Sequence, residues 1–176
     1  MSEDNLRSPV IRVVDCYLAR ATDSGFEFLL LLRAPGKIYA GDWRMVGGKI
    51  RPHEKAWEAA LREVNEETGL SVEAFFTVPY VNRFYEWHHD RINDIPVFVG
   101  LVQGSNPTLD AEHTDFAWLS VEGAVERLPW PGQRDGLLAA HQLLTASEHI
   151  KTLWQVDFHE SAGKPGRGTF GDSSFM

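Results

Sequence analysis

The chain has 176 residues, a length that suits a single domain. Hydrophobic residues make up 43% of it and charged residues 24%, which is typical of globular proteins, and the formal net charge is −8. A charge of this sign argues against non-specific binding to long nucleic acid, which requires a basic face. It does not exclude a small phosphate substrate whose contact with the protein is mediated by cations.

The sequence also indicates the cellular compartment of the protein. Its longest apolar stretch, residues 28–32, is far shorter than the ~20 residues needed to cross a bilayer. The N-terminal segment MSEDNLRSPV is polar and acidic and lacks the pattern of a secretory signal. The single Cys16 cannot form an intrachain disulfide. We therefore expect a cytoplasmic protein without membrane or long nucleic acid partners, and a homodimer is one open alternative for its oligomeric state.

The N-terminal part of the chain begins with a predicted β-hairpin. Its strands are residues 10–19, which are rich in β-branched side chains, and residues 26–33, joined by the turn-like segment 21–25. A loop at 34–42 contains proline and two glycines, and a short strand is predicted at 43–46. A glycine pair, Gly47 and Gly48, follows directly.

A helix is predicted at residues 54–68, where apolar side chains recur with helical spacing at Ala56, Trp57, Ala60, Leu61 and Val64. Gly69 is the expected end of this helix, with Leu70 placed for the apolar contact of a Schellman-type terminus. Its start is less well marked, because no Ser, Thr, Asp or Asn precedes it. Pro52 fits near the first turn.

The remaining elements alternate between strands and helices. Strands are predicted at 72–78, 81–86, 95–102 and 116–119, and helices at 121–127 and 133–149. This mixture indicates an α/β or α+β fold with a mixed sheet between helices. We place an N-terminal extension at 1–9, one domain at 10–160, and a weakly packing tail rich in Gly and Ser at 161–176.

Three glutamates share one face of the predicted helix 54–68. Glu63, Glu66 and Glu67 fall within an arc of about 100°, where like charges repel by ~0.2–0.5 kcal/mol per pair. We expect Arg62 to balance Glu58, four residues before it, and the three glutamates to lack cationic partners. Clustered carboxylates of this kind suit Mg²⁺, which takes oxygen ligands. The alternative is an ordinary solvated helix face.

The stretch GKIRPHEKAWEAALREVNEETGL, residues 48–70, resembles the Nudix box, the signature of the Nudix hydrolases. That box reads Gly, five residues, Glu, seven residues, Arg-Glu-aliphatic-any-Glu-Glu-any-Gly-aliphatic. Its positions are all matched, by Gly48, Glu54, Arg62, Glu63, Val64, Glu66, Glu67, Gly69 and Leu70. Flanking features extend the resemblance over residues 10–149. It implies a Nudix fold, an α/β/α sandwich around a mixed sheet, and hydrolysis of a nucleoside diphosphate linked to another moiety with Mg²⁺ or Mn²⁺.

The resemblance also implies roles for the residues of the box. It makes Glu63, Glu66 and Glu67 metal ligands, the last two at the centre of catalysis, with the backbone carbonyl of Gly47 as a further ligand. The structural residues are then Gly48, Glu54, Arg62 and Gly69, and an ion pair between Glu54 and Arg62 is expected to hold the loop against the helix. Bridging metal ions offset the negative charge of such a substrate and lower the pKa of a bound water.

A fourth acid is expected outside the box. Glu112, in DAEHTDFAWLS, is the candidate, as a metal ligand or a general base, with Asp110 and Asp115 as weaker candidates. An exposed loop acid is the alternative for Glu112. The segment is similar to the Glu-His…Trp stretch of bacterial dATP and dihydroneopterin triphosphate pyrophosphohydrolases, which the chain resembles more than other Nudix subfamilies.

The substrate contacts are predicted from aromatic and cationic residues around the box, namely Arg33, Trp43, Arg44, Arg83 and Tyr85. The segment 82–94, NRFYEWHHDRIND, offers Tyr85 or Trp87 for stacking on a base and Arg83 or Arg91 for phosphates. Packing of these aromatics in the core is an equal alternative. The adjacent His88 and His89 are predicted to be solvated rather than metal-bound.

Three functions are compatible with these features. The favoured one is Mg²⁺-dependent hydrolysis of a nucleoside triphosphate, such as dATP, to the monophosphate and pyrophosphate. The second is hydrolysis of another nucleoside diphosphate derivative, such as a dinucleoside polyphosphate. The third is a non-catalytic binding module, which typically loses box glutamates, whereas this chain keeps all of them.

Overall fold

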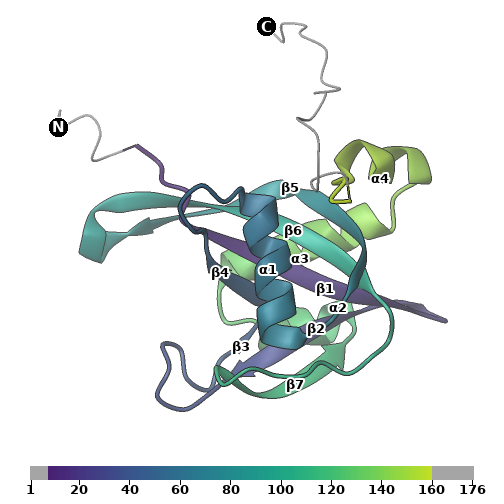
Figure 1. Ribbon diagram of the computed structural model, residues 1–176, viewed down its shortest axis with the longest axis horizontal. Helices are drawn as coiled ribbons and strands as arrows, with labels where there is room; N and C mark the ends of the chain where they lie inside the picture. Colours follow the sequence, from purple (N-terminus) through teal and green to yellow (C-terminus); the bar gives the residue numbers. More distant parts are fainter. Residues whose placement is uncertain (1–7, 160–176) are drawn as a thin grey trace, which may run out of the picture.

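The computed structural model describes residues 8–159 and contains one mixed seven-stranded sheet between helices (Figure 1). The strands are β1 Val13–Thr22, β2 Gly25–Arg33, β3 Trp43–Arg44, β4 Val46–Lys49, β5 Val72–Glu86, β6 Arg91–Val102 and β7 His113–Leu119. The strand order is β3-β2-β1-β6-β5, with β4 also paired to β1 and β7 to β2. The pair β1–β6 is parallel and the others are antiparallel, so the predicted mixed sheet is confirmed.

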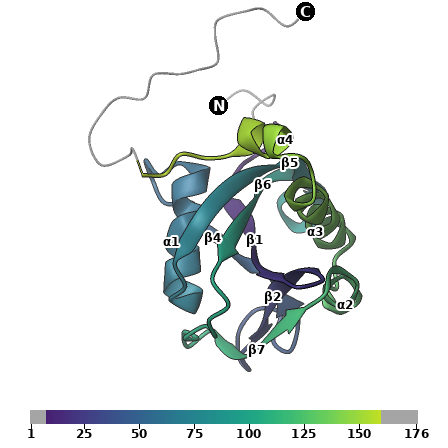
Figure 2. The same ribbon diagram turned by 90° about the vertical axis from the view of Figure 1, so that its right-hand side faces the viewer.

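Helices cover both faces of this sheet. They are α1 Ala56–Thr68, α2 Val121–Arg127, α3 Pro131–Leu144 and α4 Glu148–Trp154, with a short 3-10 turn, η2, at Trp87–His89. Helix α1 lies on one face, and α2 and α3 lie on the other (Figure 2). The layers are those of an α/β/α sandwich, as the sequence predicts. Within residues 8–159 no helix is long and apolar enough to cross a membrane.

The central strand β1 shows how the sequence directs this layering. Successive side chains of a strand point to opposite faces. Val14, Cys16 and Leu18 therefore pack with α1, whereas Tyr17 and Ala19 pack with α2 and α3. Because β1 is covered on both sides, its buried positions, residues 14–19, are mainly apolar. Asp15 is the charged residue among them, and it is discussed below.

Helix α1 is held at both ends by its own sequence. Its N-cap is Lys55, whose backbone N–H donates to Glu58 Oε2 over 2.9 Å, so an acid three residues on replaces a capping side chain before the helix. We expected Glu58 to pair with Arg62, and it caps the helix instead. At the other end Gly69 adopts a left-handed φ of 65°, and its N–H donates to Asn65 O. The predicted glycine stop is confirmed, although in its simpler one-bond form.

The structure corrects several predicted boundaries. The segments 72–78 and 81–86 form one strand, β5, whose register shifts between Thr77 and Val81, because Pro79 has no N–H to donate to the ladder. Strand β6 begins at Arg91, earlier than predicted, and with β5 forms a hairpin that extends beyond the body of the sheet (Figure 1).

The predicted helix 133–149 is two helices. Helix α3 starts earlier, at Pro131, and ends before Thr145, and α4 begins after the N-cap Ser147. The Ser147 hydroxyl accepts from Ile150 N, so it starts a new helix where the periodicity alone suggested continuation. Most of the extension 1–9, and all of the tail 161–176, lie outside the described residues.

Candidate active site

The C-terminal half of α1 lies against the glycine pair of β4. Neither Gly47 nor Gly48 has a positive φ, so a left-handed backbone is not the reason for this glycine pair. Close approach is the reason for these glycines. A Cβ at Gly48 would lie 2.1 Å from Glu63 Oε1, and one at Gly47 would lie 2.7 Å from the backbone carbonyl oxygen of Val14. Only glycine lets this strand lie so near both the helix carboxylate and the neighbouring strand.

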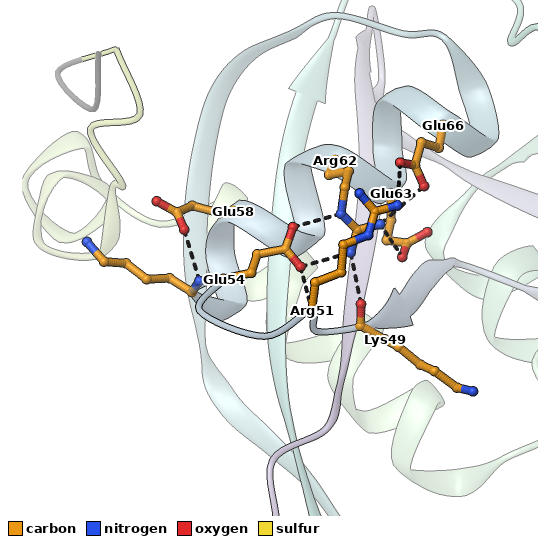
Figure 3. A network of polar contacts seen from close by, with 8 residues as sticks. Lys49, Arg51, Glu54, Glu58, Arg62, Glu63 and Glu66 are labelled. Atoms are coloured by element: carbon orange, nitrogen blue, oxygen red, sulfur yellow. Dashed lines mark hydrogen bonds and ion pairs between the residues drawn. The ribbon is translucent and has the colours of Figure 1, made fainter. Parts of the chain in front are cut away.

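Arg62 is the centre of a polar network along this face of α1 (Figure 3). Its guanidinium donates to Glu54 Oε1 over 2.7 Å, to Glu63 Oε1 over 2.6 Å and to Glu66 Oε2 over 3.1 Å. A fourth bond, of 2.8 Å, goes to the backbone carbonyl of Lys49 in β4. The expected pair between Glu54 and Arg62 is present, and it ties the loop before α1 to the helix.

The expectation that all three face glutamates lack cationic partners is wrong. Arg62 lies four residues before Glu66 and binds it as well as Glu63. Arg51, in the loop after β4, adds a second cation to Glu66 at 3.0 Å. The hydrogen bond from Arg62 lowers the pKa of Glu54 to about 2, so this carboxylate is ionised at neutral pH.

Glu67 has a different environment from its two neighbours. It is 5% exposed, and its Oε2 has no hydrogen-bond partner. Burial, followed by the charges of Glu63 and Asp110, raises the pKa of Glu67 to about 9, while a hydrogen bond from the backbone amide of Gly47 acts in the opposite direction. A buried carboxylate with an unpaired oxygen is costly unless something else satisfies it.

The residues at this site fit a divalent cation by the chemistry of their donors. The unpaired Oε2 of Glu67, the Glu63 carboxylate pressed against the glycine pair and the carbonyl of Gly47 are oxygen donors of the kind that Mg²⁺ prefers. Within residues 8–159, however, no three acidic, histidine or cysteine side chains form a ready-made metal centre. The arginines hold Glu63 and Glu66 instead, so the ligand set is a proposal.

Glu112 lies directly before β7 and binds cations of the β2–β3 segment. Arg33 Nη1 donates to Glu112 Oε2 over 2.7 Å, and Lys37 Nζ lies 3.7 Å from Oε1. The hydrogen bond from Arg33 is the main cause of a lowered Glu112 pKa. Asp110 lies in the same loop, and its charge contributes to the raised pKa of Glu67. Its Oδ1 accepts from the Glu112 N–H over 3.0 Å and lies 2.8 Å from His113 Nδ1.

Three of the predicted substrate residues lie at the β2 and β3 end of the sheet. Arg33 ends β2 beside Glu112. Trp43 is half-buried, with the Arg127 guanidinium 4.7 Å from its ring centroid, and Arg44 lies 4.9 Å from the centroid of the Tyr39 ring. Cations therefore already stack on aromatic rings in this region.

The structure does not bring Arg83 and Tyr85 to the box. Both lie on the protruding β5–β6 hairpin (Figure 1). Arg83 donates twice to Asp94, over 2.6 and 2.7 Å, and the Tyr85 hydroxyl donates to Asp90 over 2.8 Å. These side chains stabilise the hairpin itself, which weakens the case for them as substrate contacts.

Some residues near the site were not predicted from the sequence. Arg51 was missed, although a cation soon after the glycine pair was a visible signal. Tyr39 and Trp130 come together only through the fold, with ring centroids 5.4 Å apart. Asp15 is 4% exposed on β1, and burial raises its pKa to about 6, with Asn82 Nδ2 3.4 Å from its Oδ2. A lone acid within an apolar strand was the available signal for it.

The comparisons with known proteins agree with this geometry. Residues 10–140 match the NUDIX domain, over most of the chain. The chain therefore belongs to the Nudix family and is a Nudix hydrolase.

Similar curated proteins differ in function. An octanoyltransferase of Myxococcus xanthus is 30% identical over 135 residues, 72% of this chain but only 36% of that protein. Nucleoside triphosphatase NudI of Klebsiella pneumoniae (strain 342) is 25% identical over 63% of this chain and 83% of its own length. The asymmetrical bis(5'-nucleosyl)-tetraphosphatase of Mus musculus is 26% identical over 74% and 88%, respectively.

Similar solved structures show the fold. An Ap4A hydrolase of C. elegans superposes with a TM-score of 0.64 at 20% identity, over 77% of this chain and 98% of that one. The E. coli dihydroneopterin triphosphate pyrophosphohydrolase gives 0.60 at 18% identity, over 75% and 94%. The expected likeness to this last subfamily is thus one of several, and these similarities identify the family rather than the substrate.

Proposed function

We propose that the protein hydrolyses a nucleoside triphosphate to the monophosphate and pyrophosphate, with Mg²⁺ as cofactor and Mn²⁺ able to replace it. The observation that carries this proposal is the packing of the box helix on the glycine pair, with Glu63 against Gly48 and the Glu67 carboxyl group, whose Oε2 has no partner, accepting from the Gly47 amide. The proposal places the phosphate chain and its cation beside these oxygens.

The proposed ligands are Glu63, Glu66, Glu67 and the Gly47 carbonyl, with Glu112 or Asp110 as a further acid. When bound, the cation neutralises phosphate charge and lowers the pKa of a coordinated water. The carboxylates then lose their mutual repulsion, and Glu67 gains a partner for its unpaired oxygen. Arg62 positions Glu63 and Glu66 from the helix side, through bonds of 2.6 and 3.1 Å.

Cations of the chain itself complete the environment for a phosphate chain. The net charge of −8 would otherwise repel such a substrate. Arg33 and Lys37 flank Glu112, and Arg51 beside Glu66 has a side chain that is 59% exposed. Phosphoryl transfer needs mostly positioning and charge neutralisation, which this set of groups supplies.

The attacking water requires an acceptor for its proton. The box carboxylates approach from one helix, so we assign this role to the loop before β7, which carries Asp110 and Glu112. The ion pair with Arg33 lowers the Glu112 pKa and makes it a weak base, which favours a ligand role for Glu112. Asp110, whose charge acts on Glu67, is the better-placed acceptor.

The similarity to a nucleoside triphosphatase supports this proposal. The similarity to an asymmetrical bis(5'-nucleosyl)-tetraphosphatase supports the second candidate, hydrolysis of a dinucleoside polyphosphate. The complete set of box carboxylates argues against a non-catalytic binding module.

A substrate panel tests the proposal. The full chain is incubated with Mg²⁺ and each of the common ribo- and deoxyribonucleoside triphosphates, dihydroneopterin triphosphate and diadenosine tetraphosphate. Pyrophosphate, orthophosphate and the nucleotide products are measured separately. Pyrophosphate with the matching monophosphate supports the favoured function. Release of ATP and AMP from diadenosine tetraphosphate alone supports the second candidate. The Glu66→Gln variant is the control for contaminating activity, and equal turnover by both proteins would refute the assignment.

A further inference from the structure

Two arginines hold the two oxygens of the Glu66 carboxylate (Figure 3). Arg51 Nη2 donates to Oε1 over 3.0 Å, and Arg62 Nη1 donates to Oε2 over 3.1 Å. A divalent cation bound to either oxygen would lie close to a guanidinium, and like charges at such a distance repel strongly. Binding of a metal ion by Glu66 therefore favours the release of one arginine.

The two arginines differ in how firmly their side chains are held. The Arg62 side chain is 16% exposed and is fixed by further bonds to Glu54 and to the Lys49 carbonyl. The Arg51 side chain is 59% exposed, and among residues 8–159 Glu66 is the one carboxylate with which it pairs. Arg51 is therefore the arginine that can leave Glu66 without breaking other ion pairs.

The backbone of Arg51 is fixed, in contrast to its side chain. Its N–H donates to Glu54 Oε2 over 2.8 Å, and its carbonyl oxygen accepts from the Glu54 N–H over 3.1 Å. Glu54 is itself held by Arg62 through two hydrogen bonds. The loop between β4 and α1 therefore gives Arg51 a fixed origin, from which its long side chain can reach acceptors other than Glu66.

The charge of Arg51 acts on the acidic face of α1 beyond Glu66. Burial raises the pKa of Glu63, and the positive charge of Arg51 is among the influences that oppose this rise. A guanidinium is always charged and carries five donors in a planar arrangement, which matches the oxygens of a carboxylate or of a phosphate group. Arg51 is therefore suited to either anion, and a cation bound to Glu66 would decide which of them it contacts.

We propose that Arg51 exchanges partners when the site is loaded: it neutralises Glu66 in the metal-free protein and moves to the phosphate chain of the substrate when a divalent cation binds Glu66. This inference rests on the proposed function, because it requires the phosphate chain to lie beside the same carboxylates. Arg51 then competes with the cation for Glu66 but strengthens the binding of the phosphate chain. The exchange makes the contact between Arg51 and the phosphate chain depend on a bound cation.

Metal binding in the absence of substrate tests the first half of the inference. The affinity of the full chain for Mn²⁺ is measured by electron paramagnetic resonance. Arg51→Ala should bind Mn²⁺ about 1.5- to 5-fold more tightly than the wild type, because it removes one exposed ion pair that competes with the cation. Arg51→Lys keeps the positive charge and should bind Mn²⁺ nearly as the wild type does.

Methylenediphosphonate tests the second half, because it resembles pyrophosphate, carries no base and resists hydrolysis. Its affinity is measured by calorimetry at saturating Mg²⁺ and again without divalent cations. With Mg²⁺, Arg51→Ala should bind it about 10-fold more weakly than the wild type, as expected for the loss of a charge-assisted hydrogen bond. Without a cation the two proteins should bind it equally weakly, because Arg51 then remains with Glu66.

Lys55→Ala is the matched control for Arg51→Ala. Lys55 is an exposed cation of the same loop, and its ammonium lies 5.8 Å from the centroid of the Trp57 ring. The substitution changes the net charge by the same amount and should leave both affinities as in the wild type. Thermal unfolding of all three variants should resemble that of the wild type, since each change is on an exposed side chain.

The two shifts in Arg51→Ala decide the inference. Tighter Mn²⁺ binding together with weaker diphosphonate binding supports it, because a damaged fold would weaken both. A loss of both affinities, a shift in only one, or no shift at all overturns it, even if the protein hydrolyses nucleoside triphosphates. If the two opposite shifts occur in a protein that hydrolyses no triphosphate, the exchange of partners stands and the proposed function fails.

Discussion

The carboxylate of Glu63 occupies the space that a side chain on Gly48 would need, since a Cβ there would lie 2.1 Å from Glu63 Oε1. The two residues belong to different elements, and the box motif places them fifteen positions apart in the sequence. Their contact explains why the motif begins with a glycine. It also separates two effects that are usually combined in a glycine substitution, displacement of a functional group and strain of the backbone.

Gly48→Ala should therefore damage activity more than stability. The new methyl group displaces the flexible end of Glu63, which can rotate at little cost to the fold, so the free energy of unfolding should change by less than about 1 kcal/mol. The displaced carboxylate should lower kcat/KM by about 10²-fold, the typical effect of moving a catalytic group by about 1 Å. Urea unfolding and steady-state kinetics measure the two effects.

Gly47→Ala is the matched comparison for this prediction. Its Cβ would meet the backbone carbonyl of Val14 at 2.7 Å, and a backbone atom cannot rotate away. The β1–β4 pair must shift, and we expect a loss of about 1–3 kcal/mol in stability. If Gly48→Ala destabilised the protein as much as Gly47→Ala does, the Glu63 contact would not be the reason for the first glycine of the box.

Glu67→Gln and Glu66→Gln should abolish most activity without unfolding the protein. Burial raises the pKa of Glu67 to about 9, so at pH 7 this carboxyl group must take up a proton on folding. A neutral amide avoids that cost and should leave stability at pH 7 equal or higher. Glu66→Gln loses ion pairs to Arg51 and Arg62 at a 43% exposed side chain, worth less than about 1 kcal/mol. Turnover should fall roughly 10²–10³-fold in each, as when other electrostatic groups are removed.

The control for these two variants is Glu122→Gln, a change of the same charge in the exposed first turn of α2. It should keep wild-type turnover. Near wild-type turnover of Glu66→Gln or Glu67→Gln at saturating Mg²⁺ would show that the altered residue is not a ligand.

The pair between Glu54 and Arg62 should make stability depend on pH. Arg62 lowers the pKa of Glu54 to about 2, below its ordinary value of 4.5. A carboxylate with a lowered pKa stabilises the folded state above its unfolded pKa, and this contribution disappears as pH falls from about 5 toward 2. The difference in unfolding free energy between the wild type and Glu54→Gln should therefore be largest at pH 7 and shrink at acid pH.

Urea titrations of both proteins at pH 7, 5, 4 and 3 measure this difference, and subtracting the two curves removes the contributions of the other carboxylates. A difference that stays constant over this range would mean that the stabilisation does not depend on the charge of Glu54.

The sequence predicted the parts of this protein that are local. The box is contiguous, so helix periodicity, the glycine stop and the shared face of three glutamates could all be inferred from neighbouring residues. The division of 133–149 into two helices was missed, because the apolar pattern crosses the turn and the capping role of Ser147 depends on its conformation.

Contacts between distant segments could not be predicted in the same way. Arg33 and Glu112 lie 79 residues apart and meet because β7 pairs with β2. The same pairing, rather than any motif, sets the partner of the candidate fourth acid. The chain also contains several aromatic residues whose location the sequence does not give, and only the fold shows that Tyr39 and Trp130 meet whereas Tyr85 lies in β5, on the protruding hairpin.

The last prediction concerns the two acids before β7. Glu112 is bound by Arg33 and approached by Lys37, which keeps it ionised but makes it a weak proton acceptor. We expect Asp110→Asn to lower kcat more than Glu112→Gln does, by about 10²-fold or more if Asp110 accepts a proton from the attacking water. The loss in Glu112→Gln should be partly recovered by raising Mg²⁺ or Mn²⁺, as a ligand role requires.

Two further measurements make this comparison decisive. Asp110 lies 2.8 Å from Nδ1 of the buried His113, so thermal unfolding of Asp110→Asn must be close to that of the wild type before its kcat is interpreted. Asp115→Asn, in β7, removes a third acid from the same segment and should leave both kcat and KM unchanged. If Glu112→Gln instead lost about 10²–10⁴-fold in kcat at every metal concentration, with KM little altered, Glu112 would be the general base despite its ion pair, and Arg33 would have to release it in the substrate complex.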